Sequence, residues 1–100
     1  SHLYDSSHPA ILKLIKGVID SGTKAGIEVS LCGEMAGDPK LTKLLIGLGL
    51  RNFSMHPSSI LKVKKMIINS DTRTLSNKVK KIIKTNNRDQ IDNLINKLNT

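Results

Sequence analysis

The sequence predicts an α/β fold in which two short parallel strands alternate with helices. The expected order is helix, strand, helix, strand, helix, followed by two more helices. Because each crossover returns the chain to the same end of the sheet, this alternation predicts parallel pairing. Two strands are too few for a parallel sheet covered on both faces. We therefore expect residues 1–100 to be a single segment, the C-terminal portion of a (β/α)₈ TIM-type barrel of about 250 residues.

The first helix is expected to begin at His8-Pro9, because proline suits the first helical turn. Gly22 and Gly26 end it. Residues 27–31 then alternate apolar and polar side chains and include β-branched residues, which indicates a short strand. The helix should bury a wide apolar stripe at helical spacing, formed by Ile11, Leu12, Leu14, Ile15, Val18 and Ile19.

A glycine-containing loop at residues 32–37 follows the first strand directly. Asp38-Pro39 predicts a helix start, with the aspartate as N-cap and proline at the first position. This helix should stop within Gly47-Leu48-Gly49. Its expected buried stripe is Leu41, Leu44, Leu45 and Leu48.

The second strand is expected at about residues 52–55, where His56-Pro57 interrupts it. Ser58 or Ser59 is then expected to cap the next helix. Asn86-Asn87 marks the break between the last two helices. The stripes of these three helices are Ile60, Val63, Ile67 and Ile68; Leu75, Val79, Ile82 and Ile83; and Ile91, Leu94, Ile95 and Leu98.

The net charge of +8 raises the possibility of a nucleic-acid partner. Lysine outnumbers arginine thirteen to three, and the only aromatic residues are Tyr4 and Phe53. Specific readers of nucleic acid use arginine and stacking aromatics, so we expect no nucleic-acid partner. The alternative is a truncated remnant that acts as a basic binding or assembly module, and tight, steeply salt-dependent binding would favour it.

Nothing in the sequence suggests export or membrane insertion. No run of 18 apolar residues is present, and the first residues lack a signal-peptide pattern. A single cysteine, Cys32, fits a reducing, cytoplasmic location. A free cysteine is often inert packing. Its position after a strand, on a glycine-rich turn, instead favours a working thiol, because ligands of α/β folds bind there.

The motif Cys32-Gly33-Glu34-Met35-Ala36-Gly37-Asp38-Pro39 resembles the signature of the phosphoenolpyruvate-utilising enzymes. Within them, the chain is most similar to the Enzyme I group of the bacterial phosphotransferase system. The likeness extends over essentially the whole chain. Its other parts are residues 1–4, 14–20, 45–50, 53–55 and 63–68, and the helical tail that follows.

The resemblance implies a homodimeric phosphotransferase, either of the sugar-transport system or of its nitrogen-related counterpart, since residues 32–39 match both equally well. Such an enzyme moves the phosphoryl group of phosphoenolpyruvate (PEP) to its own histidine and then to the carrier HPr. Its barrel binds PEP and Mg²⁺, and Cys32 would be the acid that protonates the enolate to give pyruvate. Thiols are mostly protonated at neutral pH, which suits this role. A PEP synthase or pyruvate phosphate dikinase relative is the alternative.

The other working residues of the family have no counterpart in this chain and are expected before Ser1. They are the phosphorylated histidine, the arginines that hold the substrate and the acidic Mg²⁺ ligands. No residue of this chain is expected to bind metal, and the isolated chain is expected to be inactive.

The remaining candidate residues have modest expected roles. Gly33 and Glu34 are possible loop support for the thiol, although Glu34 more simply stabilises the next helix start. His2, His8 and His56 lie in no phosphohistidine motif, and only His56 is expected to face the site. The His56-Pro57 pair departs from the smaller residues usual in the family. The default expectation for Arg51, Arg73 and Arg88 is a solvated surface position.

Overall fold

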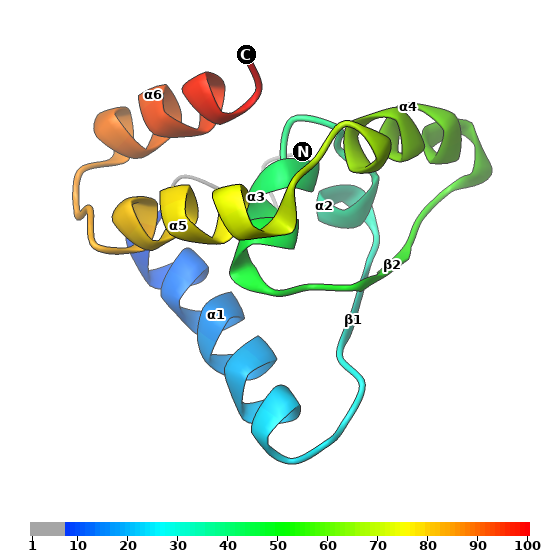
Figure 1. Cartoon of the computed structure of the whole chain (residues 1–100), viewed down its shortest axis with the longest axis horizontal. Coiled ribbons are helices and arrows are strands. Elements are labelled where there is room, and N and C mark those ends of the chain that lie inside the picture. The colour runs from blue at the N-terminus through cyan, green and yellow to red at the C-terminus, as the bar shows by residue number, and fades with distance from the viewer. Residues whose placement is uncertain (1–7) are drawn as a thin grey trace.

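The computed structural model describes residues 8–100, which form six helices and two strands (Figure 1). The predicted order is confirmed, with one short additional helix where a loop was expected. The elements are α1 (Pro9–Lys24), β1 (Ser30–Cys32), α2 (Glu34–Gly37), α3 (Thr42–Leu48), β2 (Asn52–Ser54), α4 (Pro57–Ile68), α5 (Thr72–Ile83) and α6 (Arg88–Leu98). The predictions for residues 1–4, including His2 and Tyr4, lie outside the described residues.

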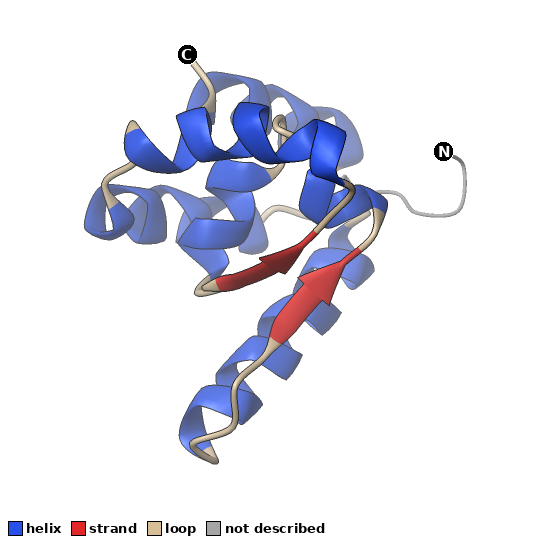
Figure 2. Cartoon of the chain, turned by 90° about the vertical axis from the view of Figure 1, so that its right-hand side faces the viewer, coloured by secondary structure: helices blue, strands red, loops and turns tan. Residues whose placement is uncertain are grey.

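The two strands form a small parallel sheet, as predicted (Figure 2). Ser30 pairs with Asn52, Leu31 with Phe53 and Cys32 with Ser54. Leu31 and Phe53 are partly buried and pack against the hydrophobic core. Side chains alternate between the two faces of a strand, so the other pairs lie on the opposite face. The sheet therefore has one apolar face against helices and one face of polar side chains and a thiol.

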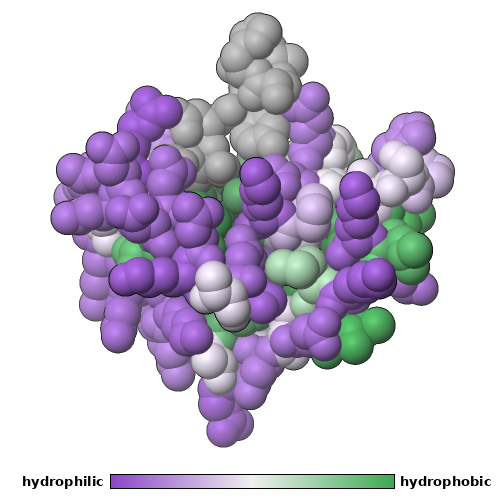
Figure 3. Space-filling model, turned by 90° about the horizontal axis from the view of Figure 1, so that it is seen from above, coloured by the Kyte–Doolittle hydropathy of each residue, from purple (hydrophilic) through white to green (hydrophobic). Residues whose placement is uncertain are grey.

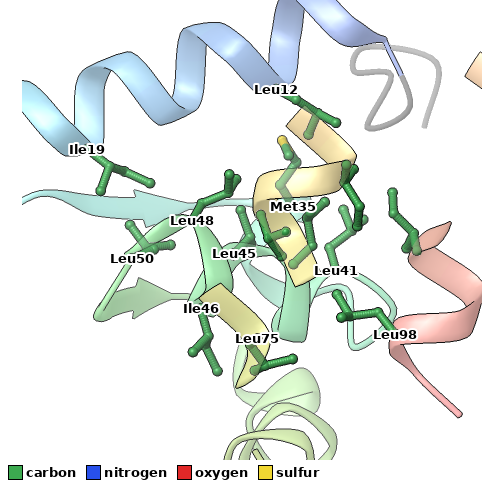
Figure 4. Packing of buried hydrophobic residues seen from close by; sticks show 14 of the residues in the cluster. Leu12, Ile19, Met35, Leu41, Leu45, Ile46, Leu48, Leu50, Leu75 and Leu98 are labelled. Atoms are coloured by element: carbon green, nitrogen blue, oxygen red, sulfur yellow. The ribbon is translucent and has the colours of Figure 1, made fainter. Parts of the chain in front are cut away.

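The core is centred on α3, whose Leu44, Leu45 and Leu48 are fully buried. Leu12 and Ile19 of α1 contact this cluster from one side (Figure 4). Helices α5 and α6 cover the other side of the core with the apolar residues predicted to be buried. They contribute Leu75, Val79, Ile82, Ile91, Ile95 and Leu98.

Two predicted stripes are wider than the buried surface. On α1, Leu14 and Val18 are 63% and 53% exposed, because this side of the helix meets no described element. On α4, Val63 is the buried member of the expected stripe, and Ile67 is 42% exposed. The space-filling view shows apolar side chains gathered on the side where α4 lies (Figure 3). Periodicity identified both helices correctly but overstated how much of each surface is covered.

The predicted helix start at Asp38-Pro39 is wrong by about one turn. Asp38 Oδ1 accepts a hydrogen bond from the Lys40 amide at 3.0 Å, and the Asp38 carbonyl accepts one from the Leu41 amide at 3.0 Å. These bonds form a turn, and α3 begins only at Thr42. Aspartate followed by proline supports both conformations, which is why the sequence pattern did not distinguish them.

The predicted cap of α4 is also wrong. The N-cap is His56, not Ser58 or Ser59, and its Nδ1 accepts a hydrogen bond from the Ser58 amide at 3.2 Å. His8 caps α1 in the same way, with its Nδ1 3.1 Å from the Ala10 amide. In both helices proline occupies the first helical position, where it removes no hydrogen bond.

Candidate functional site

Cys32 is the last residue of β1, and its side chain is exposed. The predicted strand, residues 27–31, is observed at Ser30–Cys32, so the cysteine lies in the strand rather than after it. This is the carboxyl end of a parallel strand, the edge at which α/β folds bind ligands. The thiol is therefore not packed among the described residues.

Gly33 turns the chain sharply after the cysteine. Its φ of 82° and ψ of −152° fall in a region that essentially only glycine adopts. A β-carbon at Gly33 would have nothing within 4 Å, so the requirement for glycine comes from the backbone alone. The glycine expected to support the loop therefore fixes the direction in which the chain leaves Cys32.

The short helix α2 anchors the loop in the core. Met35 and Ala36 are buried, and Met35 belongs to the hydrophobic cluster. A β-carbon at Gly37 would lie 3.2 Å from Ser59 Oγ and 3.4 Å from Met55 Cβ, so this glycine allows close approach to the segment after β2. Glu34 is exposed and lies in the first turn of α2, at the place expected of an acid at a helix start.

Ser54 lies directly opposite Cys32 in the strand register, at the end of β2. Its side chain is also exposed. Ser54 was expected only as part of the second strand and of the family-like segment 53–55, and no site role was predicted for it. The expected strands end at residues 31 and 55, so aligning their ends would not pair Ser54 with Cys32, and the register is seen only in the structure.

Arg51 and His56, which lie next to β2, both hydrogen-bond to nearby backbone groups. Arg51 is exposed, as expected, and its Nη1 also donates to the carbonyl oxygens of Ile46 at 2.9 Å and Leu50 at 2.8 Å. These bonds tie the C-terminal end of α3 to the start of β2. The Nδ1 of His56 is engaged at the start of α4, as described above. Arg73 and Arg88 are exposed on the last two helices.

An open cavity of about 480 Å³ lies between β2 and α4. Its walls include Phe53, Ile60 and Ile67, with Arg51 and Lys64 also lining it. Ile60 is 44% exposed, so this apolar surface is uncovered. The described residues thus leave the outer side of β2 and α4 without a packing partner.

Between residues 8 and 100, no three His, Cys, Asp or Glu side chains are grouped closely enough to hold an ion. No helix in the same range is both long enough and apolar enough to cross a membrane.

Comparison with known proteins identifies the family. Residues 1–72 match the PEP-binding domain of the PEP-utilising enzymes. The chain is 46% identical over 83 residues to the phosphoenolpyruvate-protein phosphotransferase of Cupriavidus necator, covering 83% of this chain and 14% of that protein. It is 41% identical over 90 residues to the protein of that name from Borreliella burgdorferi, covering 90% of this chain and 16% of that protein.

A third relative of the same name, from Buchnera aphidicola subsp. Baizongia pistaciae, is 41% identical over 96 residues, which is 96% of this chain and 17% of that protein. The chain thus spans about a sixth of the length of these curated relatives. The matched domain and the relatives agree with the resemblance carried by residues 32–39. The chain belongs to the PEP-utilising enzyme family and contains part of its PEP-binding domain.

Proposed function

We propose that this chain is the C-terminal part of the (β/α)₈ barrel of a phosphoenolpyruvate–protein phosphotransferase. The observation that carries the proposal is the exposed thiol of Cys32 at the carboxyl end of a parallel strand, within a segment that matches the PEP-binding domain. The uncovered apolar side of β2 and α4 supports a larger barrel, because further strand and helix units would cover it.

In the proposed mechanism, Cys32 is the general acid of pyruvate formation. Loss of the phosphoryl group from PEP leaves the enolate of pyruvate. The S–H bond then breaks, a C–H bond forms at carbon 3, and the sulfur retains the electron pair as a thiolate. Proton donation by a positioned side chain contributes about 10²- to 10⁴-fold to the rate of such steps.

The residues that follow Cys32 hold the backbone at the end of its strand in place. Gly33 sets the direction of the chain after the thiol, and buried Met35 and Ala36 fix α2 in the core. A fixed backbone at the strand end limits the positions that the sulfur can reach, which favours proton delivery to one face of the enolate. We assign Glu34 to the helix start and give it no part in proton transfer.

The phosphoryl transfer itself is assigned to residues outside this chain. Mg²⁺ would neutralise the phosphate charge, but the described residues do not fit an Mg²⁺ site, so no step here depends on a metal that they hold. PEP, an HPr-type carrier, a phosphorylated histidine and a homodimeric barrel belong to the proposed whole enzyme. The isolated chain should be inactive.

The role of Cys32 is tested in a full-length phosphotransferase that contains residues 1–100. This is either the protein from which the segment comes or a relative in which residues 1–100 replace the matching segment. Cys32→Ala should lower pyruvate formation by about 10²-fold or more, since it removes the proton donor. PEP affinity, measured by titration calorimetry, should change little. Wild-type turnover by Cys32→Ala would refute the assigned role.

The isolated chain provides the complementary test. It is mixed with PEP and Mg²⁺, and pyruvate is followed by a coupled assay. No pyruvate should form above the rate without protein, because the groups that stabilise a transferring phosphoryl group are absent. Sustained turnover would contradict the assignment of this chemistry to other parts of the enzyme.

A further inference from the structure

Cys32 and Ser54 are the last residues of the two parallel strands, and they pair in the register. Paired residues of neighbouring strands project their side chains from the same face of a sheet, and neighbouring strands lie about 4.8 Å apart. The alternate pair, Leu31 and Phe53, packs against the core. The thiol and the hydroxyl therefore lie side by side on the open face, away from the helices.

Neither side chain is committed elsewhere within residues 8–100. No hydrogen bond of the Cys32 sulfur or the Ser54 hydroxyl to another described side chain or backbone group is present, and both residues are exposed. The serine hydroxyl is thus available to the neighbouring sulfur. Each side chain can change between staggered χ1 rotamers, which allows the two groups to approach.

We propose that Ser54 is a positioning residue for the Cys32 thiol, an inference that rests on the proposed function. As the thiol gives its proton to carbon 3 of the enolate, the Ser54 O–H donates a hydrogen bond to the negative sulfur. Hydrogen bonds to an ionised partner are about twice as strong as neutral ones, so the bond strengthens as proton transfer proceeds. Solvent then returns a proton to the exposed sulfur, and the serine keeps its own.

The test measures the chemistry of the sulfur directly, in a full-length phosphotransferase that carries this segment. Iodoacetamide alkylates the thiolate form of a cysteine, and the modified Cys32 peptide is quantified by mass spectrometry over time. Ser54→Ala should slow alkylation at neutral pH by roughly 3- to 10-fold, because the variant lacks the hydrogen bond that stabilises the negative sulfur. It should lower kcat for pyruvate formation by a similar factor and leave KM unchanged.

Two further variants make the test specific. Ser54→Thr keeps a hydroxyl on the same strand and should restore both rates to within about twofold, a difference below 0.5 kcal/mol. Ser30→Ala removes an exposed hydroxyl from the same strand as Cys32, but at the position paired with Asn52, and should leave both rates unchanged. If Ser54→Ala acted only by disturbing the sheet, the hydroxyl of Ser54→Thr would not restore the two rates and Ser30→Ala would lower them as well.

The outcomes separate this inference from the proposed function. If Cys32→Ala abolishes pyruvate formation while Ser54→Ala alkylates and turns over like wild type, the role of Ser54 is refuted and that of Cys32 stands. The role of Ser54 is also refuted if Ser30→Ala has an equal effect. If Cys32→Ala turns over normally, the proposed function fails, whatever Ser54 does to alkylation.

Discussion

Gly47 of α3 lies so close to Val79 of α5 that a β-carbon at position 47 would overlap the valine side chain. The same β-carbon would lie 2.8 Å from the carbonyl oxygen of Leu75. The contact between α3 and α5 is the most extensive one between described elements. The absence of a side chain at Gly47 therefore sets how closely the central helix and the helical tail pack.

Gly47→Ala should lower the free energy of unfolding by about 1–3 kcal/mol, as overpacking of a tight interior contact does. The Leu75 carbonyl is backbone and cannot turn aside as a side chain can. Urea denaturation followed by circular dichroism measures the change. Gly17→Ala is the matched control, because Gly17 lies in α1 and a β-carbon there would have nothing within 4 Å. This substitution should raise the free energy of unfolding by up to about 1 kcal/mol. Equal effects of the two substitutions would contradict the close-packing argument.

Gly33→Ala should cost about 1–3 kcal/mol, because alanine is strained at a φ of 82° and ψ of −152°. No neighbour would be displaced, so the penalty should appear as a distorted turn next to Cys32. Hydrogen exchange should increase locally in α2 in the same variant. Site-resolved alkylation of Cys32 should also change.

Gly26 provides the comparison for Gly33, since it has a φ of 68° and an equally open surrounding. Asparagine tolerates that left-handed conformation, so Gly26→Asn should be nearly neutral in stability and leave Cys32 alkylation unchanged. A Gly33→Ala variant with wild-type stability and alkylation would show that the turn does not depend on the glycine conformation.

Much of this fold could be predicted from the sequence because helical periodicity shows where the helices lie and which side of each faces the core. The stripe of α6, from Ile91 to Leu98, is one example. The parallel pairing of β1 and β2 followed from the order of elements alone. The position of Cys32 at a strand end was predicted to within one residue, because a β-branched run and a glycine bracket it.

The features that could not be predicted depend on contacts between elements that are distant in the sequence. Leu14 and Val18 have the same periodicity as Leu12 and Ile19, and only the packing of α1 on α3 decides which pair is buried. The pairing of Ser54 with Cys32 depends on a register between strands 22 residues apart, which no local pattern specifies. Cys32 was predicted as a site residue because it follows a strand and begins the motif of residues 32–39, whereas the pairing that brings Ser54 next to it is seen only in the structure.

His56→Ala should lower the free energy of unfolding by about 1 kcal/mol, since it removes the acceptor for the Ser58 amide at the start of α4. His56→Asn should retain most of this stability, because asparagine is among the best N-cap residues. Thermal unfolding of the three proteins measures both changes. Ser59→Ala tests the earlier expectation of a serine cap. If Ser59→Ala lowered the free energy of unfolding and His56→Ala did not, serine rather than histidine would be the N-cap of α4.

Thr42→Val should raise the free energy of unfolding by about 1 kcal/mol. Thr42 is fully buried at the start of α3, and its Oγ1 has no hydrogen-bond partner among the described residues. A buried hydroxyl without a partner loses its hydration and gains nothing in return, whereas valine has nearly the same shape. Thr42→Ser provides the control: it keeps the hydroxyl, removes the methyl group and should therefore be destabilising. Urea denaturation of the three proteins measures these differences, and a loss of stability in Thr42→Val would show that the hydroxyl has a partner after all.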